Sequence, residues 1–220
     1  AESAHVAFFS LEMGMDQILM RLYSSHSGLT LNKIRSGKLS DSEMLLLYAA
    51  KNTLDKFNIY LDEAGATDVE ELVTVCRKLK RDGKLDLVII DYLQLLTTSK
   101  RTTNRVEEVS KISRQLKMMA RELQVPVLAL SQLSRDIEKR EDKRPVLSDL
   151  RESGSIEQDA DIVMFLHREQ PKNEDTTRKT RNAKTELIVA KNRQGVTDSI
   201  KLVFDGSHSM FIRSDAIKEE

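Results

Sequence analysis

Short apolar runs alternate with longer amphipathic stretches over the first two thirds of the chain. The run LVII after Asp86 is continuously apolar, as expected of a strand that is covered on both faces of its sheet. The amphipathic stretches repeat apolar residues every three or four positions, which is typical of helices that bury one face. The pattern predicts strands over residues 6–10, 58–61, 85–90, 125–130 and 162–166, and helices over 15–27, 40–54, 68–82 and 104–123.

Local signals set the ends of two of these helices. Ser40 is followed three residues later by Glu43, the spacing at which the two side chains can cap a helix N-terminus together. Asp68 can cap the next helix, and Gly83 is placed to end it. A short helical segment is also predicted from Ser148 onward.

Alternating strands and helices predict an α/β fold with a mostly parallel sheet and helices on both faces. The last third differs, because residues 186–190 and 199–204 flank the polar stretch NRQGVTD and predict an antiparallel hairpin. We expect these C-terminal strands to extend one edge of the sheet. Residues 133–149 are highly charged and are predicted to form a loop, and the polar segment 169–184 is predicted to be mobile.

Composition narrows the function classes without choosing one. The 220 residues are 40% hydrophobic, and 35 basic residues balance 35 acidic ones, so any nucleic-acid binding must come from local basic patches. The single cysteine, Cys76, excludes an internal disulfide and is interpreted as a small apolar residue on a helix. No apolar run is long enough to span a bilayer and no signal peptide opens the chain, so a cytoplasmic protein is expected.

Three polar residues follow predicted strands, where ligands bind in parallel sheets. Glu12 follows the first strand, Asp91 ends the third and Gln132 follows the fourth. Each has an ordinary alternative: a solvated or capping carboxylate, a strand-end cap, and a loop residue. Together they are typical of a nucleotide hydrolase, in which Asp91 would hold Mg²⁺ through water. No G-x-x-x-x-G-K-[ST] loop to cradle phosphates occurs in the chain.

Longer motifs carry a specific resemblance. In order along the chain they are SLEM, VIIDYLQLL, EVSKISRQLKMMARELQVPVLALSQLSR, DKRPVLSDLRESGSIEQDADIVMFLHR and VAKNRQG. The chain resembles the RecA-like motor domain of the DnaB-family replicative helicases over nearly its whole length. In that family the phosphate-binding loop lies on the strand and helix just before SLEM. The resemblance therefore implies a helicase ATPase domain over 1–214 that lacks this strand and helix, followed by a tail over 215–220.

The resemblance also implies roles for single residues in ATP hydrolysis. Glu12 matches the glutamate that activates the attacking water, Asp91 the magnesium-binding aspartate, and Gln132 the glutamine that senses the γ-phosphate. Arg193 matches an arginine finger that reaches a neighbouring subunit's nucleotide, with Lys191 beside it. On the residues alone, both could be solvated charges beside a glycine turn. Arg21 lies where the family places an arginine near the base or ribose.

For DNA, the resemblance implies that the segment from Arg151 and Glu152 to Gly154 contacts single-strand phosphates. Arg151 offers charge, and Gly154 lets backbone N–H groups approach a phosphate. The preceding stretch adds the basic residues Arg135, Arg140, Lys143 and Arg144. A solvated charged loop is the ordinary alternative. Acidic residues are interleaved and aromatic ones are absent from this stretch, so we expect backbone tracking without sequence preference.

The implied protein is a ring of six subunits that uses ATP and Mg²⁺, moves 5′ to 3′ on single-stranded DNA, and binds a primase and a helicase loader. It would work in the bacterial cytosol or nucleoid, or in a phage equivalent. Two alternatives remain: a RecA-fold recombinase-like ATPase, and a non-catalytic RecA-like DNA-binding or loader protein. The surrounding reading frame distinguishes the motor from the non-catalytic protein. A phosphate-binding loop encoded shortly upstream favours the motor, and its absence there favours the non-catalytic protein.

Overall fold

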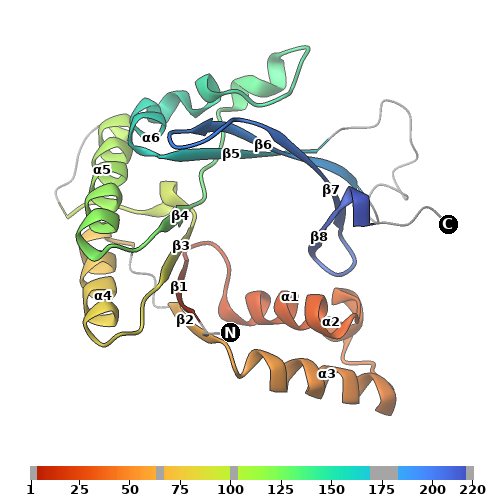
Figure 1. Ribbon diagram of the computed structural model, residues 1–220. Coiled ribbons are helices and arrows are strands. Elements are labelled where there is room, and N and C mark those ends of the chain that lie inside the picture. Colours follow the sequence, from red (N-terminus) through yellow and green to blue (C-terminus); the bar gives the residue numbers. More distant parts are fainter. Residues whose placement is uncertain (1–3, 63–66, 100–103, 169–182, 217–220) are drawn as a thin grey trace. The chain divides into compact units, whose positions relative to one another are not determined.

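The computed structural model describes residues 4–62, 67–99, 104–168 and 183–216 (Figure 1). The chain divides into two compact units. One consists of Ala1–Met15 and Asp55–Ala160 and is called the parallel-sheet unit; the other consists of Asp16–Leu54 and Asp161–Glu220 and is called the antiparallel-sheet unit. Each is described by itself. The described helices include none that is long and apolar enough to cross a membrane.

Four parallel strands form the first sheet, in the order β2-β1-β3-β4. Their bounds are β1 His5–Ser10, β2 Asn58–Asp62, β3 Leu87–Asp91 and β4 Val127–Ala129. The predicted strands are therefore confirmed, although β4 is shorter than the predicted 125–130. The register sets Ser10 opposite Asp91, so β1 and β3 end together at one edge of the sheet.

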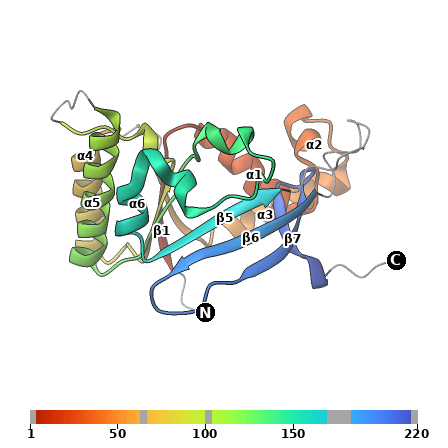
Figure 2. The same cartoon turned by 90° about the horizontal axis from the view of Figure 1, so that it is seen from above.

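Helices α4 (Val69–Arg81) and α5 (Arg105–Leu123) lie side by side in both views (Figures 1 and 2). They contribute to one hydrophobic core with the sheet, in which Phe9, Ile90 and Ile112 are fully buried. Cys76 of α4 lies in the same core, as predicted, and burial raises the pKa of its thiol to about 12. The strand β3 alternates between buried and half-buried residues, so among the described residues its second face is less covered than the sequence predicts.

Capping explains why these helices begin where they do. The Asp68 carboxylate accepts hydrogen bonds from the backbone N–H groups of Glu70 at 2.8 Å and Glu71 at 3.4 Å. Asn104 accepts one from Val106 N–H at 3.0 Å and caps α5 in the same way. Gly83 takes a left-handed conformation, with φ of 69°, just after α4 ends, as the sequence predicts.

Short helical turns and one further helix complete the parallel-sheet unit. They are the 3₁₀ turns η1 Leu93–Leu95, η2 Arg135–Lys139 and η3 Leu147–Ser153, and the helix α6 Gly154–Asp159. The Ser113 hydroxyl of α5 donates to the Asp159 carboxylate of α6 at 2.7 Å, which ties these helices together. The predicted loop over 133–149 therefore contains the 3₁₀ turn η2 and the start of η3.

The antiparallel-sheet unit contains four strands in the order β5-β6-β7-β8. With its helices, the elements are α1 Met15–Ser27, α2 Leu31–Ser36, α3 Asp41–Leu54, β5 Ile162–Arg168, β6 Ala183–Asn192, β7 Ser199–Asp205, β8 Met210–Arg213 and η4 Ser214–Ala216. The predicted hairpin is β6–β7 and is confirmed. Within the described ranges no ladder joins this sheet to the parallel one, so the expected extension of one edge is a sheet of its own. The predicted mobile segment lies mostly outside the described residues.

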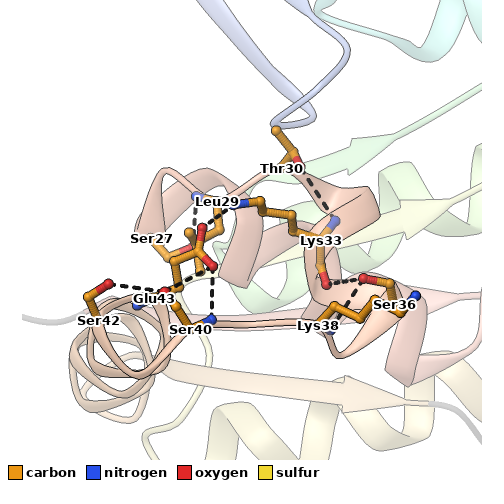
Figure 3. A network of polar contacts seen from close by, with 9 residues as sticks. All are labelled: Ser27, Leu29, Thr30, Lys33, Ser36, Lys38, Ser40, Ser42 and Glu43. Carbon is orange, nitrogen blue, oxygen red and sulfur yellow. Dashed lines mark hydrogen bonds and ion pairs between the residues drawn. The ribbon is translucent and has the colours of Figure 1, made fainter.

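The corner between α2 and α3 is built from polar contacts (Figure 3). Ser40 and Glu43 form the predicted reciprocal cap, with Ser40 N–H donating to the Glu43 carboxylate at 3.0 Å and Glu43 N–H to the Ser40 hydroxyl at 3.3 Å. Lys33 of α2 donates to the same carboxylate. The hydrogen bond from Lys33 lowers the pKa of the Glu43 carboxyl most, and the one from Ser40 N–H lowers it further. Helix α2 is absent from the sequence prediction, although Thr30 caps it and Gly37 ends it at φ 67°.

Candidate functional site

The carboxyl ends of three neighbouring strands carry the polar residues singled out in the sequence. In the sheet β1 lies beside β3, and β3 lies beside β4. Asp91 is the last residue of β3, Glu12 follows the end of β1 by two residues, and Gln132 follows the end of β4 by three. The structure thus places all three at one edge of one parallel sheet, which is where such sheets bind ligands.

The turn that carries Glu12 is fixed at both sides. Leu11 N–H donates to the Asp91 carbonyl at 2.8 Å, so the exit of β1 stays paired with the end of β3. The Ser10 hydroxyl donates to the Met13 carbonyl at 2.5 Å and accepts from Met13 N–H at 3.3 Å. The turn closes around Glu12, which is exposed and therefore accessible to a ligand.

The exits of β3 and β4 are also held together. Leu130 N–H donates to the Ile90 carbonyl and Leu93 N–H donates to the Leu130 carbonyl, both at 2.9 Å. Asp91 is half-buried and is joined to Tyr92 by a cis peptide bond. Gln132 is exposed. The edge therefore presents one half-buried carboxylate, one exposed carboxylate and one exposed amide.

These side chains fit a hydrated magnesium ion better than a metal held by protein ligands alone. In the described parts of the chain, no group of three or more His, Cys, Asp or Glu side chains is arranged to hold a metal. Mg²⁺ does not need such a group, because it keeps several waters and binds through one or two carboxylates plus substrate phosphates. Asp91 at the end of β3 meets that requirement.

Arg193 and Lys191 belong to the antiparallel-sheet unit. Lys191 lies near the end of β6, and Arg193 is the first residue beyond it. Arg193 N–H donates to the Asp161 carbonyl at 2.9 Å, and its guanidinium lies 3.5 Å from the Asp161 carboxylate, with 48% of the side chain exposed. Such a half-exposed pair is easily exchanged for another anion.

The turn after Arg193 leaves no room for a side chain at Gly195 unless the Asn192 side chain shifts. Asn192 accepts from Gln194 N–H at 3.2 Å and donates to the Val196 carbonyl at 3.3 Å, so its side chain crosses the turn. A Cβ at Gly195 would lie 2.6 Å from the Asn192 amide nitrogen. Arg21, assigned near a base or ribose, is exposed on α1 of the same unit.

The residues assigned to DNA lie along the chain from η2 to α6. Arg135 and Arg144 are exposed, and Arg151 and Glu152 fall on η3. Gly154 begins α6 with ordinary helical φ, and a Cβ there would meet nothing within 4 Å among the described residues. Packing among the described side chains therefore gives no reason for a glycine at this position.

A buried carboxylate organises this segment, and sequence reasoning missed it. Asp149, 8% exposed, accepts from the Arg140 guanidinium at 2.7 Å and from Val146 N–H at 2.8 Å. Its carbonyl also accepts from Ser134 N–H at 3.0 Å. Arg140 therefore holds the segment together, whereas the sequence suggested only a basic residue for DNA. An acid nine residues from an arginine is too weak a signal to separate the two roles.

A family model described as the DnaB-like helicase C terminal domain matches residues 1–213. The chain belongs to the DnaB-like helicase C-terminal domain family. The resemblance inferred from SLEM, VIIDYLQLL and the later motifs is thereby confirmed.

Relatives and solved structures agree with this assignment. The chain is 47% identical over 204 residues to the replicative DNA helicase DnaB of Leifsonia xyli subsp. xyli, covering 93% of this chain and 44% of the relative. It is 46% identical over 208 residues to the replicative DNA helicase DnaC of Bacillus subtilis, covering 94% and 45%. The chain thus spans a little under half the length of these relatives.

Two solved structures have the same fold. One, described as an ATPase domain, superposes with a TM-score of 0.87 at 39% identity, covering 96% of this chain and 74% of that one. The other, a DnaB-like replicative helicase studied together with its interactions with primase, superposes with a TM-score of 0.85 at 38% identity, covering 95% and 50%. The predicted RecA-like α/β fold is confirmed by this likeness together with the parallel sheet.

Proposed function

We propose that this chain is part of the ATP-hydrolysing motor of a ring-shaped replicative DNA helicase that moves along single-stranded DNA and unwinds duplex at the fork. One observation carries the proposal: Glu12, Asp91 and Gln132 lie at a single edge of three adjoining parallel strands. Membership of the DnaB-like helicase family supports it. The alternative is a non-catalytic member of the family that binds DNA or loads another protein.

In the proposed reaction, the Glu12 carboxylate accepts a proton from a water molecule. The water oxygen attacks the γ-phosphorus, the bond to the β–γ bridging oxygen breaks, and ADP and phosphate are released. Asp91 would hold a magnesium ion, through water, and this ion would neutralise charge on the phosphate oxygens. Gln132 would donate a hydrogen bond to a γ-phosphate oxygen and so distinguish ATP from ADP.

Arg193, with Lys191, would act on the nucleotide of a neighbouring subunit in a homohexamer. Its guanidinium is suited to spread the negative charge of the transferring phosphoryl group. The half-exposed pair with Asp161 supports this role, because the arginine can leave it at little cost. Arg21 would contact the base or ribose.

Single-stranded DNA would lie against the segment that contains Arg151, Glu152 and Gly154, with Arg135 and Arg144 adding charge. Because Gly154 carries no side chain, backbone N–H groups there could approach a phosphate closely. A primase and a helicase loader are proposed as protein partners, and the bacterial cytosol or nucleoid, or a phage equivalent, as the location.

The 220 residues contain no G-x-x-x-x-G-K-[ST] loop, and we propose that residues outside them cradle the phosphates. We expect the isolated 220-residue chain to show no useful ATPase activity with single-stranded DNA. Robust turnover by the purified chain would contradict this assignment of the cradle.

The motor proposal is tested by Glu12→Gln in the full-length protein. The amide keeps the shape of the side chain but cannot accept the proton, so ATP binding is retained and hydrolysis stops. Glu107→Gln, an exposed residue on α5, is the matched control and keeps normal turnover. ATP hydrolysis by the Glu12 variant at the control's rate would show that Glu12 is not the base. A full-length protein that binds DNA but neither binds nor hydrolyses ATP would favour the non-catalytic alternative.

A further inference from the structure

The side chain of Gln94 forms an unusually complete set of hydrogen bonds with the segment that carries Gln132. Gln94 lies in η1, three residues after Asp91, and is half-buried. Its amide nitrogen donates to the Gln132 carbonyl at 3.2 Å and to the Ser131 hydroxyl at 2.8 Å. Its amide oxygen accepts from Gln132 N–H at 3.2 Å.

One side chain therefore occupies both backbone polar groups of Gln132. These two hydrogen bonds resemble the pair that two peptide units exchange in a sheet. Here one partner is a side-chain amide, 38 residues away in the sequence. Rotation of the backbone at Gln132 would break both bonds at once, so the direction in which this residue leaves the backbone is fixed. The Gln132 side chain itself is exposed and can point toward a ligand.

Gln94 is itself anchored. Its backbone carbonyl accepts a hydrogen bond from the Arg105 guanidinium at the start of α5, and the same guanidinium donates to the Leu96 carbonyl at 3.4 Å. Just before it, Leu93 N–H is paired with the Leu130 carbonyl at 2.9 Å. Hydrogen bonds from α5 and from the exit of β4 thus hold the turn that carries Gln94. Because this turn is held, the Gln94 side chain can keep the Gln132 backbone in place.

We propose that Gln94 is a positioning residue, which sets the Gln132 amide at the correct place for the γ-phosphate and couples it to the strand that ends at Asp91. The proposal rests on the proposed role of Gln132 as the phosphate sensor. A shift of Gln132 on loss of phosphate would be transmitted through the Gln94 amide to η1, directly beside the magnesium-binding carboxylate.

Two substitutions in the full-length protein separate the effect of the Gln94 hydrogen bonds from the effect of its side-chain size. Gln94→Met keeps the length of the side chain and removes all three hydrogen bonds. Gln94→Glu keeps the acceptor for Gln132 N–H but places a carboxylate against the Gln132 carbonyl. Gln115→Met is the matched control, because Gln115 donates a side-chain hydrogen bond of 2.9 Å to Glu70.

We expect both Gln94 variants to lower kcat for DNA-stimulated ATP hydrolysis by about ten- to a hundredfold, the size of loss that a small displacement of a catalytic group causes. The KM for ATP should stay within about twofold, since sensing a phosphate in the transition state differs from binding the nucleotide. The Gln115 control keeps both constants. Melting temperatures equal to the control's exclude unfolding as the cause.

A double-mutant cycle with Gln132→Ala, followed by single-turnover hydrolysis, decides how Gln94 acts. If it acts through Gln132, Gln94→Met adds no further loss to Gln132→Ala. Independent, multiplicative losses would mean a merely structural role and would overturn the proposal. So would normal kcat in Gln94→Met when Gln132→Ala is impaired, which leaves the proposed function intact. Normal kcat in Gln132→Ala itself would instead remove the sensor role on which the proposal rests.

Discussion

The two units differ in their buried apolar residues. The main hydrophobic cluster of the described residues lies entirely in the parallel-sheet unit, with most members fully buried. Large apolar side chains are exposed in both units, for example Met118 at 62% in the parallel-sheet unit and Leu45 at 69% in the antiparallel-sheet unit. The difference therefore lies in the buried cluster, which lets the first unit hold groups in fixed positions.

This difference matches the chemistry proposed for each unit. A general base, a magnesium-binding carboxylate and a phosphate sensor must be aligned closely with one another, and a packed sheet edge provides that alignment. An arginine finger acts at a nucleotide held elsewhere, and Arg193 lies beyond a long strand in a half-exposed ion pair. The predictions below test this contrast.

The largest expected effect concerns Arg193. Because the guanidinium mainly stabilises charge in the transition state, Arg193→Ala should lower DNA-stimulated turnover by about a thousandfold or more, with nearly unchanged ATP binding. Lys201→Ala, an exposed cation on β7 of the same sheet, is the control and should keep its activity. Steady-state ATPase rates and nucleotide titrations give the two measurements.

Mixing two inactive variants tests whether Arg193 acts in trans. Rings assembled from Arg193→Ala and Glu12→Gln subunits contain some interfaces in which an intact Glu12 faces an intact Arg193. Those interfaces should recover part of the ATPase activity, provided that a ring does not need every site. Full activity of Arg193→Ala alone would rule out the finger and weaken the case for a ring motor.

Truncating an apolar side chain should lower the free energy of unfolding more in the parallel-sheet unit than in the antiparallel-sheet unit. Ile112, fully buried on α5, belongs to the main cluster, so Ile112→Ala leaves a cavity and should cost about 2–5 kcal/mol. Ile200 on β7 is 43% exposed, and Ile200→Ala should cost less than about 1 kcal/mol. Urea unfolding of the full-length variants measures both. Equal losses would mean that the antiparallel-sheet unit gains a comparable core by assembly.

The sequence predicts the parallel-sheet unit well because its signals are local. Asp68 caps the helix next to it, and the continuous apolar run before Asp91 identifies its strand without reference to the rest of the chain. Helix α2 is missing from the prediction because six residues give too little periodicity, even with Thr30 and Gly37 at its ends.

Contacts between distant segments could not be predicted in the same way. The Gln94–Gln132 hydrogen bonds depend on two strands lying side by side, and nothing in either segment alone identifies the other as its partner. The same holds for the second sheet: alternation predicts the hairpin, but it does not indicate which strand the hairpin pairs with. Roles in catalysis and DNA binding follow from family resemblance and stay predictions.

A smaller effect is expected from Arg151. If it neutralises one phosphate, Arg151→Ala should reduce the log–log salt slope of single-strand binding by about 0.7 and weaken binding alike for every base sequence. Fluorescence anisotropy with oligonucleotides of different sequence, at several salt concentrations, measures both. Lys117→Ala on α5 is the control. A loss confined to one sequence would contradict a phosphate contact.

The smallest effect concerns the turn between β7 and β8, which supports α2 through the 2.8 Å hydrogen bond from Leu31 N–H to the Ser207 carbonyl. Asp205 organises the turn, accepting from the N–H groups of Ser207 at 2.9 Å and His208 at 3.3 Å, with His208 Nδ1 at 2.6 Å. Burial tends to raise the pKa of Asp205, but these hydrogen bonds outweigh it, so the pKa falls below the ordinary 3.8.

A carboxyl with a lowered pKa stabilises the fold fully above its ordinary pKa, and this contribution is lost as the pH falls through the lowered value. Asp205→Asn removes the charge but keeps an acceptor for the backbone N–H groups. The variant should therefore be less stable than the parent protein near pH 6, by about 1 kcal/mol or less for a group at a partly exposed turn. The difference should shrink as the pH falls below 3.8. Urea unfolding across this range measures it, and a difference that stays constant down to the lowest pH would show that the Asp205 charge contributes nothing to the turn.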